Sequence, residues 1–363
     1  MQKVNCHFKK HTLQFTFDAG TSRGVLRTKA TYFIFITDSQ CTGIGEASPL
    51  IGLSVETPNE DAFVGYEEKL SQVCAGIDFL PKSITEMYVF LAQLALDDYP
   101  SIYFGLEMAL IDFYKGGNKL LFESAFSMRE APIPINGLVW MGNEGFMKEQ
   151  IAQKIAKGFR TIKMKIGAID WATEYRLLQA MREQFSAEEL TLRVDANGAF
   201  DETNVVSILE MLGDLQVHSI EQPIAPKQSE LMRSLCAKTP VSIALDEELI
   251  GVTEREQKKR LLEHMRPHYI ILKPSLVGGF RACDEWIAIA KEMNVGWWMT
   301  SALESNIGLN AIAQYTAFKE VNLPQGLGTG GLFHNNIDSP LTITQGTLLF
   351  RQGEVWGELP FKE

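Results

Sequence analysis

The chain has 363 residues, of which 45% are hydrophobic and 22% charged, and its formal net charge is −11. This length is typical of two domains with a sizeable core in each, and the composition excludes a disordered or fibrous protein. The acidic balance and the lack of a long basic run argue against nucleic acid as a partner.

The five cysteines are odd in number and widely scattered, with no Cys-x-x-Cys pair. This pattern favours neither a disulfide framework nor a zinc ribbon, and it indicates a reducing compartment. No apolar run reaches the roughly 18 residues that a membrane span requires. We therefore expect an untargeted cytoplasmic protein that does not associate with a membrane. The sequence carries no signal for an oligomeric state.

The amino-terminal part, residues 1–125, has the pattern of an α+β domain. Apolar and polar residues alternate over 4–17 and 25–37, which predicts two strands joined by a connection. The period becomes helical over 84–96 and 101–114. We expect this domain to precede a second one of a different type.

The second predicted domain, residues 126–335, repeats one event along the chain: a short apolar strand ends in a charged residue. These charged residues follow one another at intervals of 25 to 30 residues, and they are Lys165, Asp195, Glu221, Asp246 and Lys273. A strand, a helix and two loops occupy about that length, so the spacing predicts consecutive βα units of a parallel sheet. If the sheet closes into a barrel, these side chains converge at one mouth.

The segments between the charged strand ends support the alternation. Helix-like stretches are predicted over 171–184 and 203–212, a first barrel strand over 135–141 and an eighth near 325–328. The tail, 336–363, is rich in glycine, threonine and alternating apolar residues. It is a candidate to pair back with the amino-terminal sheet.

Three acids at successive strand ends, Asp195, Glu221 and Asp246, repel one another unless a cation lies among them. They supply hard oxygen ligands that suit Mg²⁺, and Mn²⁺ is an alternative. Zinc is disfavoured because these strand ends contain no histidine or cysteine. The competing interpretation is that each acid is only a helix N-cap.

Two lysines, Lys163 and Lys165, are two residues apart in a predicted strand and therefore share a face. The competing interpretation is an edge strand with a solvated lysine face. A metal and a second lysine nearby favour the neutral form of an ammonium group, so Lys165 is a candidate general base. Lys273 approaches from four strands away, which places a lysine on each side of a substrate. This arrangement suits removal of a proton α to a carboxylate.

Five short motifs together resemble the enolase superfamily, in its muconate-lactonizing-enzyme-like subgroup: Lys163-Met-Lys165, Asp195-Ala-Asn197, Glu221-Gln-Pro223, Asp246-Glu247 and Lys273-Pro-Ser275. The resemblance runs over nearly the whole chain. It implies a modified TIM (β/α) barrel whose mouth is closed by an amino-terminal α+β capping domain. It also implies specific roles: metal ligands for Asp195, Glu221 and Asp246, a supporting position behind them for Asn197 and Glu247, a base for Lys165, a partner near the substrate carboxylate for Lys163, and an opposite-face lysine for Lys273.

Within that subgroup the segment 297–309 resembles the o-succinylbenzoate synthases of menaquinone biosynthesis. The usual serine triplet of that family reads Thr300-Ser301-Ala302 here, which puts a direct role of position 302 in doubt. The resemblance implies Mg²⁺-dependent dehydration of 2-succinyl-6-hydroxy-2,4-cyclohexadiene-1-carboxylate, a small dicarboxylate, to o-succinylbenzoate. The candidate substrate contacts are Ser301, Thr300, Gly330, Leu53 and Ser54.

Three other functions stay open: a dipeptide epimerase, an N-acylamino-acid racemase and, from a different class, a barrel without activity that serves as a binding protein. The epimerases bind an α-ammonium group with an Asp-x-Asp motif at the end of the eighth strand, whereas residues 325–333 contain no acid here. An ammonium ion desolvated there would have no partner, at a cost of roughly several kcal/mol. The segment therefore favours a dicarboxylate substrate.

Overall fold

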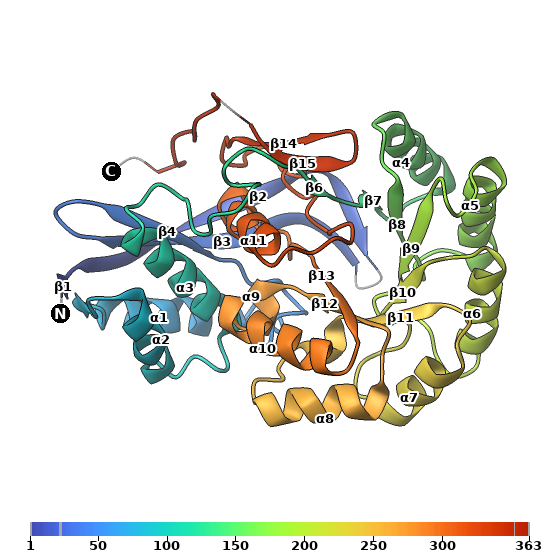
Figure 1. The fold of residues 1–363 in the computed structure, drawn as a ribbon, viewed down its shortest axis with the longest axis horizontal. Coiled ribbons are helices and arrows are strands. Elements are labelled where there is room, and N and C mark those ends of the chain that lie inside the picture. Colours follow the sequence, from blue (N-terminus) through green and yellow to red (C-terminus); the bar gives the residue numbers. More distant parts are fainter. Residues whose placement is uncertain (1, 22–23, 352, 362–363) are drawn as a thin grey trace.

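The computed structural model describes residues 2–21, 24–351 and 353–361. An antiparallel sheet and three helices form the amino-terminal part, and a strand-and-helix barrel follows it (Figure 1). The amino-terminal strands are β1 (Gln2–Lys3), β2 (Asn5–Thr21), β3 (Gly24–Thr37), β4 (Thr42–Ala47) and β5 (Phe79–Leu80). The three helices are α1 (Ala62–Ala75), α2 (Ile84–Gln93) and α3 (Pro100–Tyr114).

The first sheet has the order β2-β3-β4 with antiparallel neighbours. Strands β2 and β3 continue through most of residues 18–24, so the connection is shorter than predicted. Helix α3 packs directly on β4: a Cβ added at Gly45 would lie 1.9 Å from the carbonyl oxygen of Gly105. Only two glycines allow the two backbones to approach so closely. Helix α1 was not predicted, although its buried residues recur at helical spacing, as Tyr66, Leu70 and Val73.

The second part is a parallel sheet of seven strands in the order β13-β12-β11-β10-β9-β8-β7. Its strands are β7 (Gly137–Val139), β8 (Thr161–Lys165), β9 (Thr191–Asp195), β10 (Ser219–Glu221), β11 (Ser242–Leu245), β12 (Tyr269–Leu272) and β13 (Gly296–Met299). Parallel bridges of Gln325 with Ile135 and of Gly326 with Thr300 close the ring at the predicted eighth strand. The predicted fold class, a modified (β/α) barrel with an amino-terminal α+β domain, is confirmed.

Helices follow the barrel strands and cover the outside of the sheet (Figure 1). They are α4 (Glu144–Ala156), α5 (Trp171–Gln184), α6 (Val205–Asp214), α7 (Ser229–Lys238), α8 (Arg255–Met265), α9 (Pro274–Val277), α10 (Gly279–Glu292) and α11 (Asn306–Phe318), with a 3-10 turn η1 (Glu247–Leu249). The bounds of α5 agree with the prediction, and its N-cap Asp170 accepts a hydrogen bond from the Thr173 amide.

The tail forms a hairpin of β14 (Leu341–Thr344) and β15 (Thr347–Phe350), and β15 pairs with β6 (Ile133–Pro134). The hairpin therefore forms a sheet with β6, the segment that enters the barrel. We predicted that the tail is a candidate to pair with the amino-terminal sheet, but these two strands do not pair with β2, β3 or β4. Beyond the hairpin the Phe361 ring packs edge-on against Phe33, 5.7 Å between ring centroids. The division at residues 125 and 335 stays a prediction.

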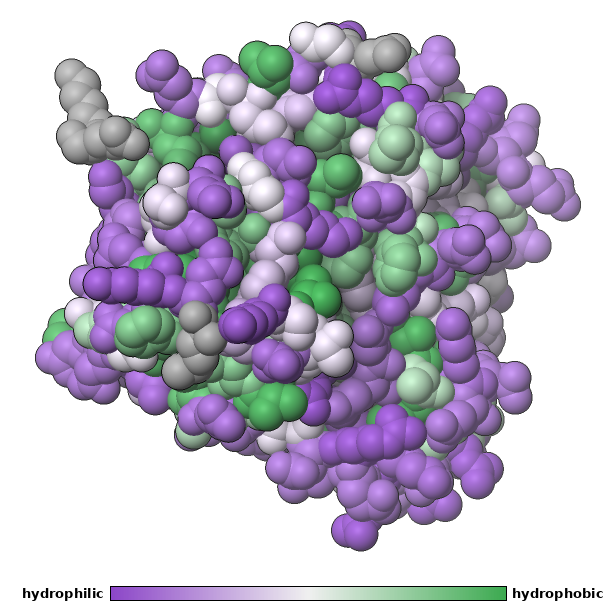
Figure 2. All heavy atoms as spheres, turned by 60° about the vertical axis from the view of Figure 1, so that its left-hand side comes forward, coloured by the Kyte–Doolittle hydropathy of each residue, from purple (hydrophilic) through white to green (hydrophobic). Residues whose placement is uncertain are grey.

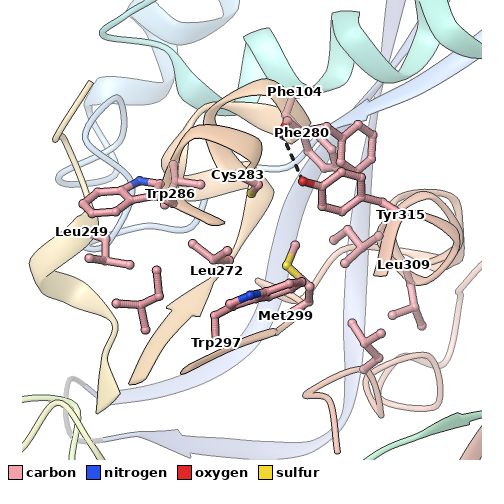
Figure 3. Packing of buried hydrophobic residues seen from close by; sticks show 14 of the residues in the cluster. Phe104, Leu249, Leu272, Phe280, Cys283, Trp286, Trp297, Met299, Leu309 and Tyr315 are labelled. Carbon is pink, nitrogen blue, oxygen red and sulfur yellow. Dashed lines mark hydrogen bonds between the residues drawn. The ribbon is translucent and has the colours of Figure 1, made fainter. Parts of the chain in front are cut away.

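An aromatic cluster ties helix α3 to the barrel helices (Figure 3). Phe104 of α3 packs edge-on against Phe280 of α10, with 5.0 Å between ring centroids. Phe280 in turn stacks on Tyr315 of α11 at 4.6 Å. The Tyr315 hydroxyl donates to Asp284 at 2.5 Å and lies 3.4 Å from the carbonyl oxygen of Phe280. The two parts of the chain therefore share one continuous core.

A buried carboxyl, Glu107 of α3, accepts hydrogen bonds from the backbone amides of Phe280 (2.5 Å) and Arg281 (3.1 Å) at the start of α10. Burial raises its pKa from 4.5 to about 8. Between these values the folded protein binds a proton that the unfolded chain releases, so the free energy of unfolding should fall as pH rises from about 4.5 to about 8. We expect Glu107→Gln to remove this contribution. Melting temperatures across this range would check it, and equal slopes for both proteins would contradict it.

The described part of the chain contains no helix that is long and apolar enough to cross a membrane. The face shown in Figure 2 is mostly hydrophilic, with small hydrophobic areas between the hydrophilic residues. All five cysteines are free, and four of them are buried.

Candidate active site

The lysine strand β8 lies inside the sheet, between β7 and β9, and all five of its residues are buried. The alternative of a solvated edge strand is therefore wrong. Lys163 donates to Asp195 (3.1 Å) and to Glu221 (2.7 Å). These carboxylates are neighbours because Asp195 and Glu221 are paired in register on β9 and β10. Ends of adjacent parallel strands thus bring the predicted residues together.

Lys165 points to the same side of β8 as Lys163. Its ammonium group donates to Asp195 (3.0 Å) and to the amide oxygen of Asn197 (2.8 Å). It also lies 5.8 Å from the ring centroid of Trp140. Burial and the charge of Lys163 lower the pKa of Lys165 more than the carboxylates raise it. Burial also lowers the pKa of Lys163, but the charges of Asp195 and Glu221 outweigh this effect, so the pKa of Lys163 is raised overall.

Lys273 reaches the same carboxylates from the far side, four strands from β8. Its ammonium group donates to Asp246 and lies 3.5 Å from Oε1 of Glu221. Glu221 therefore lies between Lys163 and Lys273: Lys163 contacts one of its carboxylate oxygens, and Lys273 lies near the other. Asp246 occupies the N-cap position of the η1 turn, but its side chain makes no capping hydrogen bond there, so capping does not account for this carboxylate.

The three acids have the right chemistry for a hard divalent cation. Their carboxylate oxygens come from the ends of three successive strands, and Oε1 of Glu221 is buried without a hydrogen bond, with the Lys273 ammonium group as its ion-pair partner at 3.5 Å. A buried acceptor without a hydrogen bond is costly, so this oxygen has room for a closer cation or donor. Within the described residues, however, no group of three or more His, Cys, Asp or Glu side chains is gathered closely enough to hold a metal. Ammonium groups lie against the three carboxylates instead: Lys163 against Glu221, Lys165 against Asp195 and Lys273 against Asp246.

Residues beside the acids fix the geometry of the strand ends. Asn197, with a left-handed φ of 45°, donates from its amide nitrogen to Glu247 (3.1 Å). Gln222, with φ 41°, accepts from the backbone amides of Asp246 (3.2 Å) and Glu248 (3.3 Å). Gln222 was not among the predicted site residues, although it belongs to the quoted Glu-Gln-Pro motif.

A cavity of about 720 Å³ opens over these strand ends. The charged lining residues within the barrel are Lys163, Lys165, Asp195 and Lys273, whereas Glu221 and Asp246 are not part of the described lining. The amino-terminal part contributes the opposite wall, with the segments 24–30 and 49–53. Asn136, Trp140 and Lys29 also line the cavity and were not predicted as site residues. Lys29 lies on β3, so its place in the cavity depends on how the two parts of the chain meet.

The predicted substrate contacts divide into two groups. Leu53, Thr300 and Ser301 line this cavity. Ser54 does not belong to the described lining, because its hydroxyl turns back to accept the Leu50 amide at 2.9 Å. Gly330 faces a second cavity, and a Cβ there would lie 2.7 Å from Asn306, so the contact predicted for it is not with the catalytic cavity.

Comparison with known proteins agrees with this geometry. The family model for enolase C-terminal domain-like proteins matches residues 147–354, more than half of the chain. The chain is 44% identical over 369 residues to the o-succinylbenzoate synthase of Desulfotalea psychrophila, covering 96% of this chain and 99% of that protein.

Two solved structures extend the comparison. The crystal structure of MenC from Desulfotalea psychrophila has a TM-score of 0.80 at 39% identity, covering 96% of this chain and 99% of that one. The L-Ala-D/L-Glu epimerase of Bacillus subtilis, with a TM-score of 0.81 and 96% of both chains covered, is only 20% identical and shares the fold. The chain therefore belongs to the enolase superfamily and, within it, to the o-succinylbenzoate synthase family.

Proposed function

We propose that the protein dehydrates 2-succinyl-6-hydroxy-2,4-cyclohexadiene-1-carboxylate to o-succinylbenzoate, in the cytoplasm and as a step of menaquinone biosynthesis. The observation that carries the proposal is the pair of buried lysines, Lys165 and Lys273, that line one cavity from strands four positions apart. The family of the chain supplies the substrate class. The reaction needs a proton to leave the carbon next to a carboxylate, which is the chemistry that this arrangement suits.

Asp195, Glu221 and Asp246 would hold Mg²⁺, with Mn²⁺ as an alternative. The ion, when bound, supplies positive charge that stabilises the negative charge developing on the substrate carboxylate. Asn197 and Glu247, which are hydrogen-bonded to each other at 3.1 Å, would keep the loop ends beside these ligands in place.

The lysines divide the remaining work. In this proposal Lys165 takes the proton from the ring carbon that bears the carboxylate, and the electron pair moves onto that carboxylate. Lys163, held charged by Asp195 and Glu221, stabilises the charge there. The pair then returns to the ring, the carbon–oxygen bond breaks, and Lys165 gives its proton to the leaving hydroxyl. One water leaves and the ring becomes aromatic, while Lys273 acts as a cation over the opposite face.

The decisive experiment is a turnover assay with the diene acid. We expect its aromatisation to be measurable by absorbance, and we expect negligible α-proton exchange on Ala-Glu-type dipeptides in deuterated water. Residues 325–333 offer a dipeptide's ammonium group no carboxylate. N-Succinylamino acids are a further control, because they also carry two carboxylates. Rapid exchange on dipeptides with no change in the diene acid would overturn the assignment and leave only the superfamily.

A further inference from the structure

One buried cation in the cavity comes from the amino-terminal sheet. Lys29 of β3 lines the cavity wall and is only 4% exposed. Its ammonium group donates to the hydroxyl and, at 3.2 Å, to the carbonyl oxygen of Ser48. An ammonium group has three N–H donors, and these two bonds leave one of them for another partner. The partners found within the described residues are neutral.

The other cations of the described lining already have carboxylate partners. Lys163, Lys165 and Lys273 contact the three acids at the strand ends. Lys10 pairs with Glu67 at 2.7 Å and Arg27 with Asp18 at 2.9 Å, and both cations are largely exposed. Lys29 forms no ion pair with any carboxylate in the described ranges. It is therefore the buried lining cation that remains for a charged ligand.

Two carboxylates in the neighbourhood of Lys29 are engaged by other groups. Glu46 accepts from Thr31 (2.7 Å) and from the backbone amides of Ser305 (2.8 Å) and Gly308 (2.8 Å), at the start of α11. The Ser48 hydroxyl in turn lies 3.1 Å from the Thr31 hydroxyl oxygen, to which it can donate, and this contact fixes the hydroxyl that holds Lys29. The ammonium group is thus held in place before any ligand arrives.

The second carboxylate, Glu304, accepts hydrogen bonds from the hydroxyls of Ser275 and Ser301, the latter at 2.5 Å. Ser301 lines the same cavity as Lys29. Burial lowers the pKa of Lys29, while Glu304 and Glu46 oppose this effect. A bound anion would offset the cost of burying the ammonium group further, because it adds a charged hydrogen-bond acceptor.

We propose that Lys29 binds the succinyl carboxylate of the substrate and so determines the preference for a dicarboxylate. The inference rests on the proposed function, which places the ring carboxylate at Lys163 and leaves the succinyl carboxylate without a partner. Gly330, one of the predicted substrate contacts, faces the second cavity. Lys29 instead reaches the catalytic cavity from the wall opposite the strand ends, where the far end of a substrate would lie.

The test compares two ligands that differ only at the far carboxylate: o-succinylbenzoate and 2-butanoylbenzoate, in which a methyl group replaces it. Dissociation constants are measured by calorimetry for the wild type, Lys29→Met and Lys154→Met. The last variant removes a partly buried lysine outside the catalytic cavity. We expect the wild type and Lys154→Met to prefer o-succinylbenzoate by about 10- to 100-fold, the range for a hydrogen bond to a charged group. We expect Lys29→Met to lose this preference while it binds 2-butanoylbenzoate normally.

Equal weakening of both ligands in Lys29→Met would assign Lys29 a structural role and overturn the inference, as would a wild type without preference. If Lys29→Met does not fold, Lys29→Gln keeps a polar partner for Ser48 and gives the same comparison. Turnover of the diene acid by the wild type separates the two proposals. If the wild type turns over the diene acid and Lys29→Met keeps the wild-type ligand preference, only the role of Lys29 is refuted. If the wild type neither turns over the diene acid nor binds o-succinylbenzoate, the proposed function is refuted, and the inference with it.

Discussion

Replacing Lys165 with alanine is expected to slow proton abstraction and so to lower kcat by roughly 10²- to 10⁴-fold, the usual contribution of a general base. The physical reason is its position: it lines the cavity, and its pKa is lowered by burial and by Lys163. The other lysine of β8, Lys163, contacts two carboxylates, whereas Lys165 contacts one. Exchange of the substrate α-proton with deuterated solvent measures the abstraction step directly.

The matched variant is Lys273→Arg, which keeps a cation beside Asp246 and Glu221. We expect it to retain part of the dehydration activity, because in the proposed mechanism Lys273 contributes charge and does not carry the proton. Circular dichroism and a melting curve should show that both variants fold. Complete and equal loss in the two variants would refute a mechanism with a single base.

Removal of divalent ions is expected to abolish turnover, and Mg²⁺ or Mn²⁺ should restore it. Glu221→Gln should lower kcat by about a thousandfold or more, since a metal ion contributes several kcal/mol of charge stabilisation. The substitution keeps the shape of the side chain but removes the charge at the residue between Lys163 and Lys273. Turnover measured against metal concentration tests both statements.

Glu210→Gln is the control for the loss of one negative charge, because Glu210 is an exposed residue of α6 away from the cavity. It should keep wild-type activity and metal dependence. Full activity of the wild-type protein in excess chelator would refute the assignment of the three acids as ligands, whatever the variants show.

The sequence by itself determined the barrel and the residues at its mouth. Lys165, Asp195 and Glu221 end consecutive strands, and parallel strands in register bring such ends together without further information. The bounds of α5 are likewise determined by nearby residues, since a capping aspartate and a helical apolar period define them. These features depend on neighbours in the chain or on a regular repeat.

Only the tertiary structure decided which residues form the rest of the cavity. Glu46 and Ser305 are 259 residues apart, yet their hydrogen bond joins the amino-terminal sheet to α11 and orders the surroundings of Lys29. The Ser54 hydroxyl turns away from the cavity into a local turn, and Gly330 lies at the second cavity beside Asn306. Periodicity and motif spacing report the face of each strand or helix, but they do not report which distant segment packs against it. The capping wall, and with it the contacts that select the substrate, is therefore set by long-range packing.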